Sequence, residues 1–61
     1  MKKILIVEDD AILLSTLVDN LSHEKKFEIV TAKDGEEALE TALREHPDLI
    51  LLDILLRRLN N

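Results

Sequence analysis

The sequence has no cysteine and a single aromatic residue, Phe27. Without cysteine no disulfide can stabilise the chain, which suits a reducing compartment. One proline and one glycine are present, and no segment is repeated or of low complexity. No apolar run approaches the ~20 residues of a membrane span, and Glu8 ends the N-terminal apolar run too early for a signal peptide. We therefore expect a cytoplasmic protein with no membrane partner.

The chain is also short and acidic. A domain of 61 residues buries a smaller fraction of its surface than a large domain does, so a chain without disulfides usually needs a metal or a partner subunit. Apolar residues nevertheless make up 46% of the sequence, as in a folding chain. The net charge is −5, and nucleic-acid phosphates select basic surfaces. Direct binding to nucleic acid is therefore not expected.

What the sequence does have is an alternation of strand and helix patterns. The first segment is a β-branched apolar run, typical of a strand buried on both faces. Leucines then recur with helical spacing, and a later segment alternates like an edge strand. The second helix places Ala38, Leu39, Ala42 and Leu43 on one side. The expected elements are a strand over 3–7, a helix from Ala11 to near Lys25, a strand over 27–32, a helix capped by Asp34 and ended by Pro47, and an apolar strand over 49–53.

The order β-α-β-α-β constrains the topology. Parallel strands are joined by right-handed crossovers, so two crossovers that step in opposite directions put the helices on opposite faces. The expected fold class is α/β with strand order 2-1-3. The third strand then has a free, apolar outer edge, and such edges are usually covered or paired.

Acidic residues follow two of these strands. Glu8, Asp9 and Asp10 come directly after the first strand, and Asp53 ends the third. Ligands of open α/β sheets bind at the carboxyl ends of the strands. Converging carboxylates repel unless a cation neutralises them, and Mg²⁺ prefers such oxygen ligands. A carboxylate there can also accept a phosphoryl group. Alternatively, the acids after the first strand serve only the N-terminal dipole of the helix.

Three segments, KKILIVEDDAILL, VTAKDGEEALE and PDLILLDI, resemble the first half of a response-regulator receiver domain, the CheY-like fold. They cover nearly the whole chain in that family's order and spacing. The resemblance implies half of a flavodoxin-like doubly wound parallel sheet, with residues 1–61 as a truncated (half) receiver domain. It also implies phosphoryl acceptance from a sensor histidine kinase in two-component phosphorelay signalling. Such a module is not an enzyme, except that it catalyses its own phosphorylation.

The same resemblance assigns roles to individual residues. It implies that Asp53 is the phosphoacceptor and, with Asp9, a direct Mg²⁺ ligand. Glu8 matches the acid that holds the metal through water, and the backbone carbonyl of Leu55 matches the position that completes the metal shell. Asp10 matches a variable position, and we expect it to cap the first helix.

The chain departs from the family pattern after the phosphoacceptor. Arg57 stands where proline is usual, and Asn61 where glycine is usual. The family's phosphoryl-binding Ser or Thr, its Lys and its last two strands have no counterparts in this sequence. An arginine near Asp53, from the pair Arg57 and Arg58, could take over the charge of that Lys.

Three physical states are compatible with the sequence. The chain is a fragment of a longer receiver, or it pairs with a second copy through antiparallel third strands, or it exchanges helices with a second copy. We expect the homodimer through the third strand, because a small chain with a free apolar edge needs a partner. In that state the protein would be an interaction or scaffold module without phosphotransfer.

Overall fold

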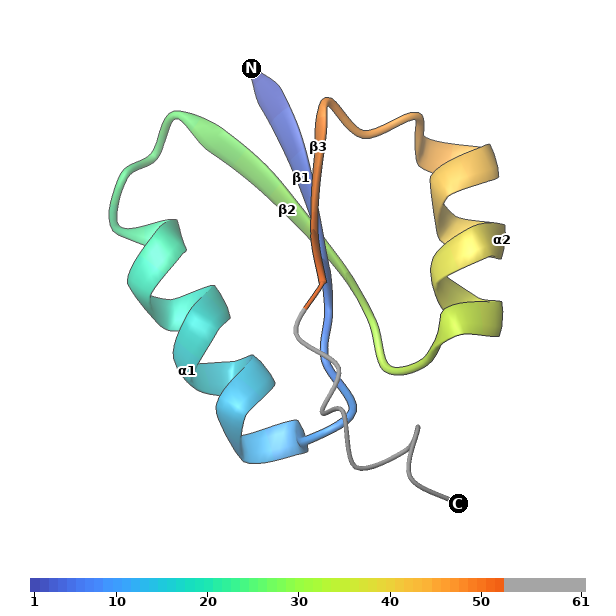
Figure 1. The fold of residues 1–61 in the computed structure, drawn as a ribbon. Coiled ribbons are helices and arrows are strands. Elements are labelled where there is room, and N and C mark those ends of the chain that lie inside the picture. The colour runs from blue at the N-terminus through green and yellow to red at the C-terminus, as the bar shows by residue number, and fades with distance from the viewer. Residues whose placement is uncertain (53–61) are drawn as a thin grey trace.

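The computed structural model describes residues 1–52 of the chain. They form a parallel sheet with the strand order β2-β1-β3, and Figure 1 shows α1 and α2 on opposite sides of that sheet. The expected half of a flavodoxin-like doubly wound fold is thereby confirmed. Neither helix is long and apolar enough to span a membrane. The elements are β1 (Lys2–Val7), α1 (Ala11–Ser22), β2 (Phe27–Ala32), α2 (Gly35–Glu45) and β3 (Leu49–Leu52).

An aspartate caps the N-terminus of each helix. Asp10 accepts hydrogen bonds from the backbone N–H groups of Ile12 and Leu13 at the start of α1, and Asp34 accepts one from Glu37 in α2. These bonds satisfy donors that have no partner within a helix. Both caps were predicted from the sequence.

The two helices end in different ways. Helix α1 ends at Ser22, three residues before the predicted limit, and Lys25 has a φ of 54° that cannot continue a helix. Helix α2 ends at Glu45, and its C-cap residue His46 has a φ of 50° and donates its N–H to the Ala42 carbonyl at 2.9 Å. Pro47 follows, as expected for a chain that leaves a helix.

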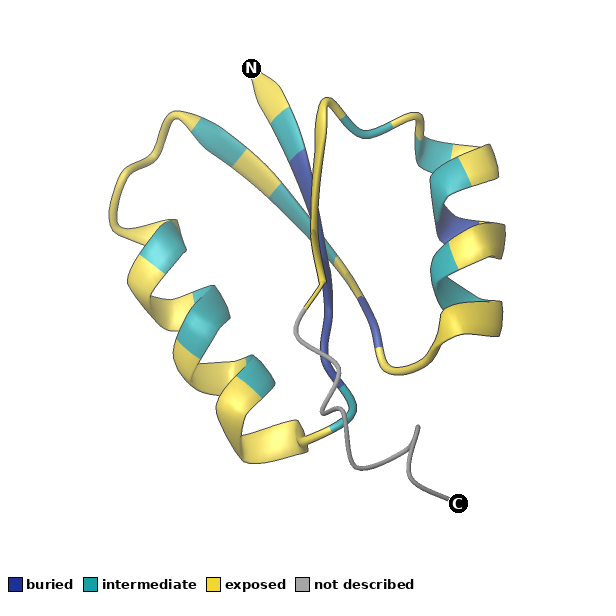
Figure 2. Ribbon diagram, viewed as in Figure 1, coloured by how far each residue is buried: buried dark blue, intermediate teal, exposed yellow. Residues whose placement is uncertain are grey.

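The core lies along β1. Leu5, Ile6 and Val7 are fully buried, as Figure 2 shows for the C-terminal part of this strand. On the side of α2, Leu5 and Val7 form a cluster with Ala32, and Ala38 of the helix packs against it. Because each face of β1 lies under a helix, the strand has no polar side, as its sequence indicated.

The structure corrects the predicted apolar stripe of α2. Ala38 and Ala42 pack against the core and Thr41 is buried, but Leu39 and Leu43 are 62% and 67% exposed. Successive helical residues are about 100° apart, so Leu39 and Leu43 turn away from the core when Ala38 and Ala42 face it.

The expected edge position of β3 is confirmed, and the structure adds that its faces are open as well. Its residues pair with β1 from Ile4–Leu49 to Val7–Leu52. Within residues 1–52, no helix Cα lies within 8 Å of a β3 Cα. All four β3 residues are therefore exposed, from 38% for Leu51 to 69% for Leu52.

Candidate functional site

The carboxyl end of β1 carries a buried acid, Glu8. Its backbone N–H donates to the Ala32 carbonyl at 3.0 Å, which extends the pairing with β2 by one residue. Its side chain is 1% exposed, and Oε1 accepts a hydrogen bond from the Asp10 backbone N–H at 2.9 Å. The turn that leads into α1 therefore helps to hold this carboxylate in place.

The next two acids have different surroundings. Asp9 is half-buried, whereas Asp10 is exposed and its Oδ1 accepts from Ile12 and Leu13 at 2.9 and 3.1 Å. The carboxylate of Asp10 thus serves the first turn of α1. The prediction that Asp10 caps the first helix is confirmed by these bonds.

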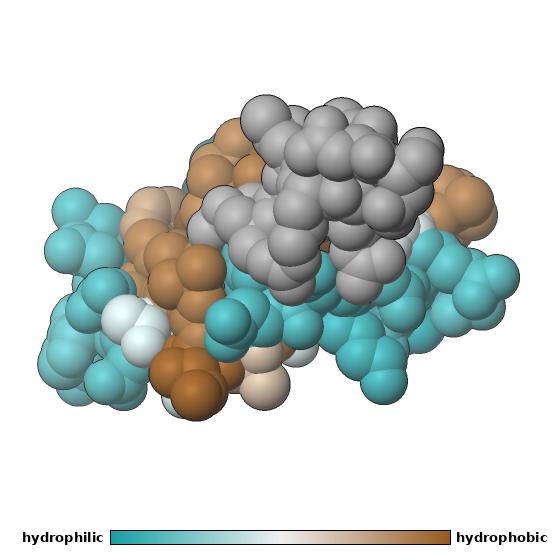
Figure 3. Space-filling model, turned by 60° about the horizontal axis from the view of Figure 1, so that its bottom comes forward, coloured by the Kyte–Doolittle hydropathy of each residue, from teal (hydrophilic) through white to brown (hydrophobic). Residues whose placement is uncertain are grey.

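The sheet brings the end of β3 to the same place. Leu52 pairs with Val7, so the last residue of β3 lies beside the last residue of β1, which Glu8 directly follows. Asp53 itself, Leu55 and the residues up to 61 lie outside the part of the chain that the structure describes. Figure 3 looks onto this end, and its visible surface is mostly hydrophilic on the α2 side, apart from a hydrophobic patch at the outer edge, and hydrophobic over parts of the α1 side.

Within residues 1–52, no three His, Asp or Glu side chains are close enough together to hold a metal ion. Two of the four predicted ligands, Glu8 and Asp9, are consecutive there, and the other two, Asp53 and the backbone carbonyl of Leu55, follow β3 in the sequence. Carboxylate oxygens are hard ligands that suit Mg²⁺. The chemistry of this donor set therefore fits the metal that the sequence predicted.

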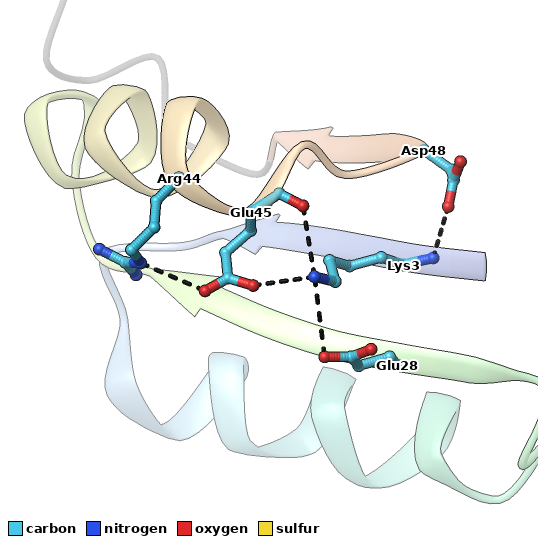
Figure 4. A network of polar contacts seen from close by, with 5 residues as sticks. All are labelled: Lys3, Glu28, Arg44, Glu45 and Asp48. Carbon is cyan, nitrogen blue, oxygen red and sulfur yellow. Dashed lines mark hydrogen bonds and ion pairs between the residues drawn. The ribbon is translucent and has the colours of Figure 1, made fainter. Parts of the chain in front are cut away.

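A second polar cluster lies at the opposite end of the sheet, at Lys3 (Figure 4). Lys3 Nζ lies 2.8 Å from Glu45 Oε1 and 3.8 Å from Glu28 Oε2, while Arg44 Nε lies 3.2 Å from Glu45 Oε2. The hydrogen bond with Glu45 raises the pKa of Lys3, and the same bond with Lys3 lowers the pKa of Glu45. The cluster joins α2 to β1 and β2, so its role is in the fold rather than at the acidic site.

Sequence reasoning missed this cluster. Lys3 and Glu45 are 42 positions apart, and no motif in the sequence links them. A weak signal was present, since a lysine inside an otherwise apolar strand needs a partner when it is half-buried.

Comparison with known proteins identifies the fold's family. Residues 4–60 match the family model of the response regulator receiver domain. The chain is 46% identical over 59 residues to the alkaline phosphatase synthesis transcriptional regulatory protein PhoP of Bacillus subtilis, covering 97% of this chain and 24% of that protein. It is 42% identical over 60 residues to the response regulator ArlR of Staphylococcus aureus, covering 98% and 27%.

One further relative is of another kind. Over 52 residues the chain is 40% identical to protein-glutamate methylesterase/protein-glutamine glutaminase 3 of Vibrio cholerae, covering 85% of this chain and 14% of that protein. No solved structure matches significantly. The chain spans about a quarter or less of the length of these relatives. It belongs to the family of response regulator receiver domains, the receiving modules of two-component phosphorelay signalling.

Proposed function

We propose that this chain accepts a phosphoryl group on Asp53 with the help of Mg²⁺, and that a sensor histidine kinase in the cytoplasm supplies it. The observation that carries the proposal is the end of β1. There a buried Glu8 and a half-buried Asp9 directly follow Val7, which pairs with Leu52 at the end of β3. Asp53 is the next residue after Leu52 in the sequence. A family match over residues 4–60 supports the same assignment.

Each residue has its own part in the proposed site. Glu8, Asp9, Asp53 and the backbone carbonyl of Leu55 would hold the metal. The bond from the Asp10 N–H to Glu8 orients that carboxylate. Bound Mg²⁺ would offset the negative charge shared by the carboxylates and the phosphoryl oxygens.

The chemistry is a phosphoryl transfer. A carboxylate oxygen of Asp53 attacks phosphorus while the bond from phosphorus to the donor breaks, and the bonding electrons leave with the donor. The product is an acyl phosphate on the aspartate. In this scheme residues 1–61 act as a half-receiver. The chain accepts the phosphoryl group and promotes its own modification.

The test is phosphorylation of the whole chain with acetyl phosphate in the presence of Mg²⁺, followed by intact-mass analysis. One phosphoryl adduct is expected on the wild type and none on Asp53→Asn. Asp34→Asn, which keeps an oxygen for the α2 cap, is the matched control and should be modified normally. An adduct that persists in Asp53→Asn would show that another residue accepts the group.

The metal ligands can be tested separately. Asp9→Asn should require a higher Mg²⁺ concentration for the same yield of adduct, because it removes one charge from the metal shell. The yield should stay unchanged in Asp19→Asn, which lies on α1 and has no proposed role in the site. Equal metal dependence in all three proteins would contradict the assignment of Asp9.

A second candidate function is supported by the exposure of β3. Two copies could pair these strands, which would remove the open edge and make a homodimeric interaction module. A two-fold axis relates neighbouring strands of one sheet only if it is perpendicular to the sheet. The pair is then antiparallel, with both copies of α2 on one face.

Sedimentation equilibrium tests this state, with circular dichroism on the same sample. We expect a folded particle of twice the chain mass. Leu51→Lys should give monomers, because it places like charges beside the two-fold axis. Ile12→Lys, an 81% exposed position on α1, should stay dimeric. If Leu51→Lys keeps the dimer mass, pairing through β3 is wrong.

A further inference from the structure

Strand β3 has no side-chain pattern of its own that fixes its register on β1. Its four residues, Leu49–Leu52, are all apolar. A slip of one residue would turn each side chain to the other face of the sheet, whereas a slip of two residues keeps every side chain on its own face. The apolar pattern of β3 therefore barely distinguishes the observed pairing, from Ile4–Leu49 to Val7–Leu52, from a pairing slipped by two residues.

The register decides where along β1 the third strand ends. In the observed register Leu52, the residue before Asp53, lies beside Val7. Strands rise about 3.3 Å per residue, so a slip that draws β3 back by two residues would move Leu52 by about 6.6 Å, to a place beside Leu5. Misplacing a reacting group by about 1 Å can already slow a reaction strongly. Such a slip would therefore disable a phosphoacceptor that directly follows Leu52.

Two hydrogen bonds at the start of β3 distinguish the two registers. The backbone N–H of Lys3 donates to Asp48 Oδ2 at 2.7 Å (Figure 4), and the Asp48 N–H donates to the Lys3 carbonyl at 2.8 Å. The second bond joins backbone groups, so other residues could make it. The first needs a side-chain acceptor, and residues 49–52 have none. In a register slipped by two residues, Ile50 would take the place of Asp48, and the Lys3 N–H would lose its acceptor.

Lys3 is itself held in place by its side chain (Figure 4). Its Nζ lies 2.8 Å from Glu45 Oε1 and 3.8 Å from Glu28 Oε2, and it donates to the Glu45 carbonyl at 3.3 Å. One residue of β1 thus binds both the last residue of α2 and the residue that precedes β3. The connection from α2 to β3 cannot take up two residues of β3 without losing the bonds to Asp48.

We propose that Asp48 is a positioning residue for phosphoryl acceptance, because its bonds to Lys3 hold β3 in the register that aligns Asp53 with the acids after β1. The inference rests on the proposed function, since it concerns the same site. Asp48 directly precedes β3 and Asp53 directly follows it. Asp48 therefore acts from the opposite end of the strand, through alignment alone, and contributes no ligand to the metal.

The test compares Asp48→Ala with Asp48→Asn, which keeps a side-chain oxygen for the Lys3 N–H. Acetyl phosphate modifies each whole chain over a series of Mg²⁺ concentrations, and circular dichroism gives the folded fraction. Per folded chain, Asp48→Ala should be modified at least about tenfold more slowly at saturating Mg²⁺, and Asp48→Asn should recover most of the rate. Asp34→Ala, which loses the cap of α2, is the control for reduced stability alone and should keep the wild-type rate per folded chain.

Nuclear Overhauser contacts between backbone protons of β1 and β3 measure the register itself. In the wild type Leu52 should contact Val7, and in Asp48→Ala part of this contact should be replaced by one between Leu52 and Leu5. Both alanine variants are also measured in trimethylamine N-oxide, which favours the folded state.

An unchanged rate or unchanged contacts in Asp48→Ala would overturn the proposal, as would an equal loss of rate in Asp48→Asn or Asp34→Ala. So would an Asp48→Ala chain that stays unfolded in the osmolyte while Asp34→Ala folds, because Asp48 would then hold the fold rather than the register. A wild type that shows the Leu52–Val7 contact but gains no phosphoryl adduct would instead contradict the proposed function, and with it the positioning role.

Discussion

Lys3 and Asp48 are joined by a reciprocal pair of hydrogen bonds. The Lys3 backbone N–H donates to Asp48 Oδ2 at 2.7 Å, and the Asp48 N–H donates to the Lys3 carbonyl at 2.8 Å. This pair comes directly before the first paired residues of the β1–β3 ladder, Ile4 and Leu49. It therefore sets the register that brings the end of β3 beside Glu8.

We expect Asp48→Ala to lower the free energy of unfolding by about 1 kcal/mol, because it removes an acceptor from the Lys3 N–H. Asp48→Asn keeps a side-chain oxygen and should retain most of the stability. Urea denaturation of the three proteins at one concentration measures the difference. Equal losses in Ala and Asn variants would mean that the charge of Asp48, rather than its hydrogen bond, stabilises this end of β3.

The Lys3–Glu45 pair predicts a pH dependence of stability. Its hydrogen bond lowers the pKa of Glu45, so the stabilisation is present above the ordinary carboxyl pKa and is lost as the pH falls through the lowered value. The same bond raises the pKa of Lys3, so its contribution is complete below the ordinary ammonium pKa and is lost as the pH rises through the raised value. Stability from this pair should be greatest between these limits.

Glu45→Gln should accordingly lower stability at neutral pH and reduce the loss of stability on acidification. Denaturation curves at pH 7 and at about pH 3 test this. Glu40→Gln, at an exposed position on the same helix, is the control and should keep the acid dependence of the wild type. Should the wild type and Glu45→Gln lose stability equally between the two pH values, the pair does not stabilise the fold through its charge.

How much of this structure could be predicted from the sequence depended on the range of each interaction. Local patterns sufficed for β1, for the Asp10 and Asp34 caps, and for the strand order, since periodicity, capping and crossover handedness act over short stretches. The sequence placed Leu39 on the same side of α2 as Ala38, and the prediction that it is buried was wrong. Periodicity shows which residues share a side of a helix, but not which of them face the sheet.

The acidic site was predictable in part for the same reason. Glu8 and Asp9 directly follow an apolar strand, so the sequence was enough to place them at its carboxyl end. The Lys3–Glu45 contact joins residues far apart in the chain, and no spacing signals it. The proposed metal and phosphoryl roles of Asp53 and Leu55 stay predictions, because these residues lie outside the described part.

The acids after β1 have two proposed roles, helix capping and metal binding, and variants of Asp10 distinguish them. Asp10→Ala should cost about 1 kcal/mol of stability, because the first turn of α1 loses its cap. Asp10→Asn should keep the cap, since its oxygen still accepts from Ile12 and Leu13. The Asp10→Asn variant should also be phosphorylated by acetyl phosphate to the same extent as the wild type. A loss of Mg²⁺-dependent modification in this variant would make Asp10 a metal ligand and contradict its role as a cap alone.

The open side of β3 implies that the chain has little stability to spare. Leu5 of β1 is fully buried in the core cluster against which α2 packs. Leu5→Ala should lower the free energy of unfolding by about 2–5 kcal/mol, because it removes contacts and leaves a cavity. Because small domains without disulfides are marginally stable, we expect this variant to be largely unfolded by circular dichroism. Leu39→Ala removes the same atoms from an exposed site and should change stability by less than about 0.5 kcal/mol. A large loss in Leu39→Ala at high protein concentration, absent on dilution, would instead show that a second copy buries this leucine.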